Sequence, residues 1–152
     1  MLHSFVKLYI HVSWSTKKRE KVLTKELRPK LHRHILNYAR ENQIQIDSLS
    51  NQIEHVHALL TIQSDRKLED IVRLLKGESS HWINSENLTQ GKFSWQRGYG
   101  AFSISSSHVA AVRKYIENQD EHHRKKSYGE EYASILQKYG FNVPETDESV
   151  TN

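Results

Sequence analysis

Three stretches of the chain have the apolar pattern of β-strands: residues 5–14, which are rich in β-branched and aromatic residues, and residues 43–51 and 55–62. Rough alternation of apolar and polar residues is typical of a strand with one buried face. Only three residues separate the second stretch from the third, which favours a hairpin. Residues 93–104 predict a fourth strand, which two glycines interrupt.

In other stretches the apolar residues recur every three or four positions, which is the spacing of a helix with one apolar face. Stretches of this kind predict helices over residues 25–41, 68–84, 108–123 and 128–139. Thr24 and Ser107 stand at N-cap positions, where a hydroxyl can accept a hydrogen bond from the first turn. Gly140 follows the last stretch and ends that helix.

The predicted order is strand, helix, strand, strand, helix, strand, followed by two further helices. This is the order of the split βαβ unit, so we predict an α+β, ferredoxin-like sheet. To it are added a C-terminal helix that bears Tyr115 and a further short helix. A length of 152 residues corresponds to one domain. We expect a single domain over residues 1–143, and a flexible polar tail over residues 144–152.

The composition narrows the classes of function. The chain has no cysteine, which excludes disulfides, thiolate zinc sites, iron–sulfur clusters and a cysteine nucleophile. Its net charge of +4 indicates a polyanionic partner without identifying it. No apolar run approaches the roughly 20 residues of a membrane helix, and residues 1–14 lack the features of a signal peptide. We therefore expect a cytoplasmic protein with no membrane partner.

The sharpest candidate site is the sequence His55-Val56-His57 on the third predicted strand. Because strand side chains alternate between faces, both imidazoles point the same way and could share one divalent ion. The chain has 10 histidines, so a pair at this spacing can also arise as two side chains on a solvated strand face. The spacing alone leaves both interpretations open. Other histidines, His11 among them, are expected to be structural or exposed.

A second candidate lies on the third predicted helix. Tyr115 and Gln119 are four residues apart, so they share one helix face beside an apolar stripe. A tyrosine in this place can equally be a boundary residue between the apolar and polar faces of an ordinary amphipathic helix. Three other tyrosines, Tyr128, Tyr132 and Tyr139, have apolar helical neighbours and are expected to serve in packing.

Taken together, the two features resemble the single-tyrosine HUH transposases of small insertion sequences. Members of this family move as single-stranded DNA, and some are associated with repetitive extragenic palindromes. The name HUH stands for His-hydrophobic-His, which His55-Val56-His57 matches, and the family's Tyr-x-x-x-Gln motif is matched by Tyr115 and Gln119. The resemblance runs from about residue 5 to residue 142. Further stretches similar to family members are residues 9–15, 75–80, 95–102 and 118–123.

The resemblance implies a mechanism and a set of roles. Tyr115 would attack a DNA phosphorus, release a 3′-OH and form a 5′-phosphotyrosyl intermediate, which a later 3′-OH attack resolves by rejoining DNA. His55, His57 and Gln119 would hold a divalent metal ion, Mg²⁺ or Mn²⁺. No nucleotide cofactor is expected, because the covalent bond keeps the phosphodiester energy and the sequence has no G-x-x-x-x-G-K-[ST] loop.

The resemblance also implies the partners. Family members recognise imperfect DNA hairpins and form homodimers in which the tyrosine helix can complete the metal site of the other subunit, and we expect both here. Basic residues, and one tyrosine that could stack on a base, are candidates for a DNA surface. These residues are Lys17, Lys18, Arg19, Arg73, Lys76, Arg97, Tyr99, Arg113 and Lys114.

Two other classes of protein stay open. Ferredoxin-like sheets with exposed aromatics commonly bind single strands, so the chain could be a non-catalytic nucleic-acid-binding domain. It could also be a metal-dependent hydrolase that uses the His pair with water as the nucleophile. The pairing of Tyr115 with Gln119 argues against both. The cleaved 5′ end distinguishes the hydrolase, which leaves it free.

Overall fold

The computed structural model describes residues 4–141, except for the side chains of residues 122–124. The predicted tail, residues 144–152, lies outside the described residues. In the described range the strands are β1 (Leu8–Ser15), β2 (Gln45–Asn51), β3 (His55–Ile62) and β4 (Gly100–Ile104). The α-helices are α1 (Leu27–Glu41), α2 (Leu68–Ser85), α3 (Val109–Glu117), α4 (Gln119–Lys125) and α5 (Tyr128–Lys138).

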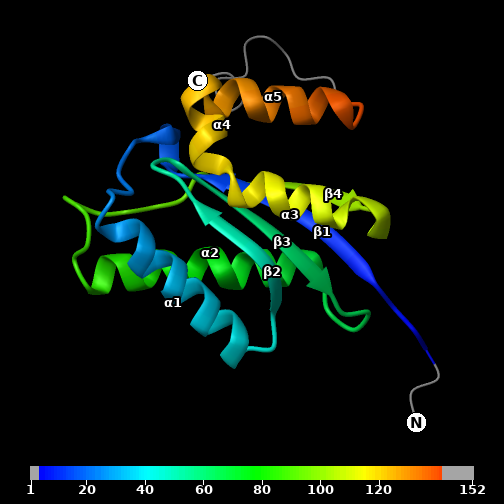
Figure 1. Cartoon of the computed structure of the whole chain (residues 1–152). Coiled ribbons are helices and arrows are strands. Elements are labelled where there is room, and N and C mark those ends of the chain that lie inside the picture. The colour runs from blue at the N-terminus through cyan, green and yellow to red at the C-terminus, as the bar shows by residue number, and fades with distance from the viewer. Residues whose placement is uncertain (1–3, 142–152) are drawn as a thin grey trace.

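The strands form one antiparallel sheet in the order β2-β3-β1-β4, with β3 and β1 at its centre (Figure 1). The element order and the pairing of β3 with β1 confirm the predicted ferredoxin-like α+β fold. In the central pair, Ser13 lies opposite His57 and Ser15 lies opposite His55. Cross-strand partners share a face of the sheet, so these serines and histidines point to the same side.

One face of the sheet is apolar and is covered by α1 and α2 (Figure 1). Alternate residues of the central strands, such as Val12, Trp14, Val56 and Leu60, are at most 2% exposed on this face. They pack against the apolar stripes of the two helices and form the main hydrophobic core. The helix residues in this core include Leu31, Ile35, Ile71, Val72 and Leu75.

The opposite face of the sheet carries α3, α4 and α5 and is polar at its centre. The intervening residues of the same strands, His11, Ser13, His55 and His57, lie here and are at most 5% exposed. Apolar packing on this face is divided between two smaller clusters beside these polar residues. Their buried members are Leu59, Val109 and Ile116 in one, and Phe102 and Leu136 in the other.

The fourth strand is shorter than predicted, because it begins at Gly100. Gly98 has a φ of +83°, a left-handed conformation that does not continue a strand. Ahead of it, an isolated bridge between Thr16 and Trp95 joins the segment to the end of β1. The predicted strand over residues 93–104 is therefore wrong for its first part.

The predicted helix over residues 108–123 is broken. Asn118 ends α3 with φ −98° and ψ 23°, and α4 begins at the next residue. Asparagine competes with the backbone for hydrogen bonds and is poor in helix interiors, which accounts for a break at this position. The break turns α4 away from the axis of α3 (Figure 1).

The other predicted elements agree with the structure to within a few residues. Helix α1 begins at Leu27, whose N–H donates to Oγ1 of Thr24 at 3.3 Å. Gly140 has a φ of +82° directly after α5, as the predicted helix end requires. In the described part of the chain, no helix combines the length and the apolarity that crossing a membrane needs.

Candidate active site

The His pair begins β3, on the polar face of the sheet, and neither ring is exposed. The Nδ1 of His55 lies 2.5 Å from Oε1 of Glu54, and the Nδ1 of His57 lies 2.9 Å from Nε2 of His11. Since a carboxylate only accepts hydrogen bonds, Nδ1 of His55 is the donor in the first contact. When Nδ1 carries the only ring proton, Nε2 of His55 has a lone pair.

His11, on β1, fixes the second ring. Burial, reinforced by the neighbouring His57, lowers the pKa of His11 to about 3, so this imidazole is neutral. It therefore has one donor and one acceptor nitrogen. When His57 donates from Nδ1 to His11, its own Nε2 also carries a lone pair. Hydrogen bonds behind the ring fix the tautomer and orientation of metal-binding histidines in this way.

Two more side chains bring oxygen atoms to the Nε2 atoms. Oε1 of Gln119, at the start of α4, lies 3.3 Å from Nε2 of His55. Oε1 of Glu131, on α5, lies 3.2 Å from Nε2 of His57 and accepts a 3.2 Å hydrogen bond from Nε2 of Gln119. The candidate ligand atoms of His55, His57 and Glu131 lie within 4.8 Å of one another. Acceptor atoms that face one another in this way fit a divalent cation with nitrogen and oxygen ligands.

Glu131 was not among the predicted site residues. Burial is the main reason that the pKa of this carboxyl is raised to about 7. Its Oε1 is in contact with Gln119 and His57, whereas its Oε2 is buried with no hydrogen-bond partner among the described residues. No short motif includes Glu131, and the apolar spacing of α5 indicates packing residues alone.

Tyr115 lies on α3, and its ring packs edge-on against two histidines. The ring centres are 5.7 Å apart for His57 and 6.1 Å apart for His11, with interplanar angles of 80° and 73°. The hydroxyl oxygen of Tyr115 is buried. Ile116, the next residue, packs on Leu59 of β3 and holds the helix against the sheet. Tyr115 and the His pair of the same chain are therefore neighbours.

The break at Asn118 changes how Gln119 reaches this site. Tyr115 and Gln119 were expected on one face of a continuous helix, but they lie on consecutive helices. Gln119 is 1% exposed, and its Nε2 lies 3.5 Å from the carbonyl oxygen of Tyr115. The two residues still lie on either side of the His pair.

Helix α5 covers the site through Tyr128. The Tyr128 ring stacks on His55 with ring centres 4.1 Å apart and an interplanar angle of 13°. Its hydroxyl is 2.9 Å from Oγ of Ser13, and the guanidinium of Arg19 lies 5.1 Å from its ring centre. Burial raises the pKa of Tyr128, so it is a neutral phenol. The prediction that Tyr128 packs is correct, but the group it packs against belongs to the site.

The residues predicted to contact DNA fall into two groups. Lys76 donates to two carbonyl oxygens of the segment 96–98, at 2.8 and 2.7 Å, and burial lowers its pKa. Arg113 forms a bidentate ion pair with Asp47, in which its Nε and Nη2 each donate to a carboxylate oxygen at 2.8 Å. Those two, Arg19 and Arg73, which lies 3.4 Å from Asp70, thus have partners within the chain. The remaining members of the set are exposed: Lys17, Lys18, Arg97, Tyr99 and Lys114.

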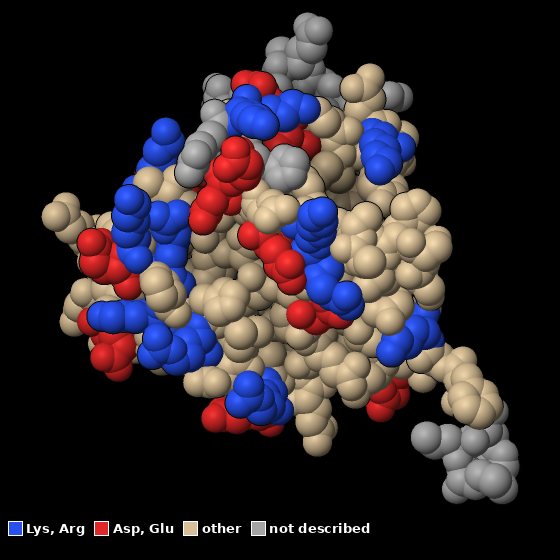
Figure 2. Space-filling view, in the orientation of Figure 1, with Lys and Arg blue, Asp and Glu red and all other residues tan. Residues whose placement is uncertain are grey.

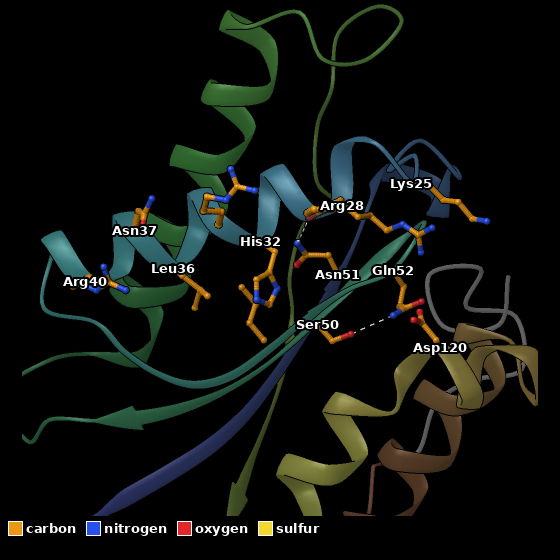
Figure 3. Close-up of a pocket in the computed structure, with 13 residues that line it drawn as sticks. Lys25, Arg28, His32, Leu36, Asn37, Arg40, Ser50, Asn51, Gln52 and Asp120 are labelled. Carbon is orange, nitrogen blue, oxygen red and sulfur yellow. Dashed lines mark hydrogen bonds between the residues drawn. The ribbon is translucent and has the colours of Figure 1, made fainter.

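A groove of about 1020 Å³ runs between α1 and β2, and it was not predicted (Figure 3). Lys25, Arg28, Arg33 and Arg40 line it from α1 and the turn before it, and Asp120 of α4 closes one end. In Figure 2, basic side chains lie over the α1 side of the molecule with acidic ones among them. Along the sequence, these cations look like ordinary surface residues of a helix and of the turn before it. They line a groove only because β2 lies beside α1.

Comparisons with known proteins identify relatives of this chain. A family model described as "Transposase IS200 like" matches residues 4–119. The ISDra2 transposase TnpA of Deinococcus radiodurans is 29% identical over 118 residues, which is 74% of this chain and 84% of that protein.

Two solved structures are similar as well. One is a crystal structure from Deinococcus radiodurans R1, described as that of a transposase. It aligns with a TM-score of 0.64 and 30% identity over 78% of this chain and 95% of that chain. The other is a REP-associated tyrosine transposase bound to a REP hairpin. It aligns with a TM-score of 0.60 over 81% of this chain and 73% of that chain. Its identity is 18%, so this second likeness concerns the fold.

Proposed function

Because the chain belongs to the family of IS200-like transposases, we propose that Tyr115 is its nucleophile and that His55, His57 and Gln119 hold a divalent metal ion. The observation that carries this proposal is the convergence of three segments on one buried site. The ring of Tyr115 packs 5.7 Å from that of His57, and Oε1 of Gln119 lies 3.3 Å from Nε2 of His55. A transposase needs a nucleophile beside a phosphate-binding centre, and these residues supply both.

The reaction is a transesterification. The hydroxyl oxygen of Tyr115 forms a bond to phosphorus, its proton is lost, and the bond from phosphorus to the 3′ oxygen of the DNA breaks. The leaving oxygen takes up a proton and becomes a 3′-OH, while the 5′ phosphate stays on the tyrosine. Attack by another 3′-OH reverses these steps and rejoins DNA. The phosphodiester energy is kept throughout, so no nucleotide cofactor is needed.

The residues around the His pair prepare it for a metal ion, which we propose to be Mg²⁺ or Mn²⁺. Glu54 and His11 bind the Nδ1 atoms, which turns both Nε2 atoms toward Gln119 and Glu131. When bound, a divalent ion draws charge from a non-bridging phosphate oxygen and orients the phosphate. This addresses one obstacle to attack, because a phosphodiester is anionic and repels a nucleophile. The other obstacle is separate, since the phenol of tyrosine, with a pKa of about 10, is a weak nucleophile at neutral pH.

We propose single-stranded DNA with hairpin ends as the substrate, acted on in the cytoplasm. The REP hairpin bound by one relative supports this substrate class. The exposed cations of the predicted DNA set and the basic groove between α1 and β2 offer phosphate contacts.

We also propose a homodimer, as the family implies. The packing of Tyr115 beside His57 of its own chain favours a site that each chain completes by itself over one completed by the tyrosine helix of the other subunit.

The test uses single-stranded oligonucleotides that span the DNA flanking the gene, incubated with Mg²⁺ or Mn²⁺. Denaturing gels and mass spectrometry are expected to reveal a covalent protein–DNA adduct on Tyr115. We expect no adduct with Tyr115→Phe, which lacks the attacking oxygen, or with His57→Ala, which lacks a metal ligand. Tyr38→Phe is the matched control, because Tyr38 of α1 is half-buried and packs against the main core, away from the candidate site.

Two results would contradict the proposal. Cleavage by Tyr115→Phe with free 5′ ends would indicate a hydrolase that uses water as the nucleophile. Tight hairpin binding by the wild-type chain without any adduct, in the presence of bound metal, would indicate a non-catalytic binding domain.

A further inference from the structure

We infer that Glu131 of helix α5 is a fourth protein ligand of the metal ion, so that metal binding fastens α5 to the His pair. This inference rests on the proposed metal site at His55, His57 and Gln119, and extends it. Helix α5 lies outside residues 4–119, the range that the family model matches, so the family match says nothing about Glu131.

The position of the carboxylate is the first argument. Oε1 of Glu131 lies 3.2 Å from Nε2 of His57, and the ligand atoms of Glu131, His55 and His57 lie within 4.8 Å of one another. Oε1 of Gln119 borders the same space, 3.3 Å from Nε2 of His55. Two imidazole nitrogens, an amide oxygen and a carboxylate oxygen thus meet from β3, α4 and α5.

The second argument is that the carboxylate of Glu131 is buried with few hydrogen bonds and, within the part of the chain that the structure describes, without a lysine or arginine paired to it. Glu131 is 6% exposed, and its Oε2 is buried without a hydrogen-bond partner in the described part of the chain. No lysine or arginine among the described residues forms an ion pair with this carboxylate. A buried carboxylate is unfavourable unless a cation or several donors compensate it, and Gln119 supplies one donor. A metal ion at the Nε2 atoms would supply the missing positive charge.

The third argument is the way α5 packs, because its contacts place Glu131 at the site. Ser127 caps the helix by accepting from the N–H of Glu130. Tyr128 stacks on His55 and hydrogen-bonds Ser13. Glu131 follows Tyr128 by three positions and so lies on the same helix face. The aromatic contact therefore determines where the carboxylate is held.

A fourth ligand has consequences for the reaction. With four protein ligands in place of three, the site would leave one position fewer for a phosphate oxygen and water. The added negative charge strengthens retention of the ion and weakens its pull on the phosphate. It also links the C-terminal helix to the catalytic centre, so that the docking of α5 depends on metal.

The experiment measures Mn²⁺ binding to the full chain, without DNA, by electron paramagnetic resonance of free Mn²⁺. We expect Glu131→Gln, which keeps the shape and removes the charge, to bind Mn²⁺ at least about tenfold more weakly than wild type. Glu130→Gln is the matched control, since the adjacent carboxylate is exposed and contacts Ser127. It should bind as wild type does. His57→Ala tests the underlying site.

A second readout follows α5 itself in the wild-type chain. We expect Mn²⁺ to slow amide hydrogen exchange in residues 128–138, and we expect Glu131→Gln to abolish that protection. This readout decides the matter if Glu131→Gln does not fold, because the wild-type comparison needs no variant. An absence of metal-dependent protection in α5 would then overturn the inference.

The outcomes separate the inference from its premise. If Glu131→Gln binds Mn²⁺ as wild type does while His57→Ala does not, the metal site stands and Glu131 is not a ligand. If the wild-type chain does not bind Mn²⁺, the proposed metal site fails and the inference fails with it. If Glu131→Gln loses adduct formation but keeps Mn²⁺ affinity, the carboxylate serves the reaction in another way and the inference is wrong.

Discussion

On one face of the sheet, β1 and β3 bury Val12, Trp14 and Leu60 beneath α1 and α2. On the other face, the same two strands bury His11 and His57 beneath α3 and α5 to a similar degree. The two faces are therefore buried to a similar extent, but one buries apolar side chains and the other buries polar ones. The first side gains stability from apolar area, whereas the second must satisfy each polar atom by a directed contact.

The helices on the two faces are also held against the sheet by different amounts of apolar packing. A continuous core anchors α1 and α2, so that little in their packing depends on any one polar contact. Helix α3 rests on a small cluster around Leu59, and α5 rests on another around Phe102. The candidate site, with Tyr115 and Glu131, lies between these two clusters, where apolar packing is less extensive than in the main core.

Truncating the core should have the largest effect on stability and none on chemistry. We expect Leu60→Ala, at a fully buried position, to lower the free energy of unfolding by about 2–5 kcal/mol. Urea denaturation measures that loss, and adduct formation is compared below the unfolding transition. There the folded fraction of Leu60→Ala should react as the wild type does.

The adjacent residue provides the contrast. Leu59 is equally buried but faces α3, where it packs against Val109 and Ile116. Leu59→Ala should therefore also lower adduct formation by the folded protein, because α3 carries Tyr115. Equal losses of adduct in both variants would show that the two faces are not separable.

A glycine-to-alanine pair tests the same contrast at smaller magnitude. A Cβ at Gly100 would lie 2.8 Å from the Tyr132 ring of α5, so Gly100→Ala should cost about 1–3 kcal/mol of unfolding free energy through overpacking. Gly77 of α2 has open space around it, and Gly77→Ala should stabilise by about 0.5–1 kcal/mol. Chemical denaturation of both variants gives the two signs. A neutral Gly100→Ala would contradict this account of how α5 packs, and a destabilised Gly77→Ala would contradict the expectation for α2.

The sequence predicted best where one periodicity governs a whole element. Strand β3 has the predicted bounds, because every second residue from Val56 to Ile62 is apolar and packs in the main core. Strand β4 and the helix that bears Tyr115 were predicted too long, since composition extends across Gly98 and Asn118 while the backbone turns there. The conformational preferences of single residues cause such breaks, and the pattern of apolar positions does not reveal them.

The site was only partly predictable for a related reason. The His pair forms one short motif, and Tyr115 with Gln119 forms another, so these residues could be identified from the sequence. His11 could have been added, because it shares a strand face with Ser13, opposite His57. The position of Glu131 depends on how α5 packs across the sheet onto His55, and no pattern within α5 encodes that contact.

The smallest effect is expected at the ion pair that joins α3 to the edge of the sheet. Arg113 of α3 binds Asp47 of β2 at 2.8 Å, and Asp47 lies at a register shift between β2 and β3. The hydrogen bond from Arg113 is the main cause that holds the pKa of Asp47 below its usual value. Both side chains are partly exposed, so solvent and salt weaken the pair. Asp47→Asn should therefore cost little stability at neutral pH.

The sign of the pH dependence sharpens this prediction. Because folding lowers the pKa of Asp47, its contribution is present above the unfolded value of about 3.9 and is lost as the pH falls through the folded value. The difference in unfolding free energy between wild type and Asp47→Asn should thus shrink between pH 7 and pH 3, and should also shrink in high salt. Asp65→Asn, in the turn before α2, is the control for the general effect of removing a carboxylate. A difference that is the same at both pH values would mean that α3 is held by its apolar contacts with Leu59 and not by this charge.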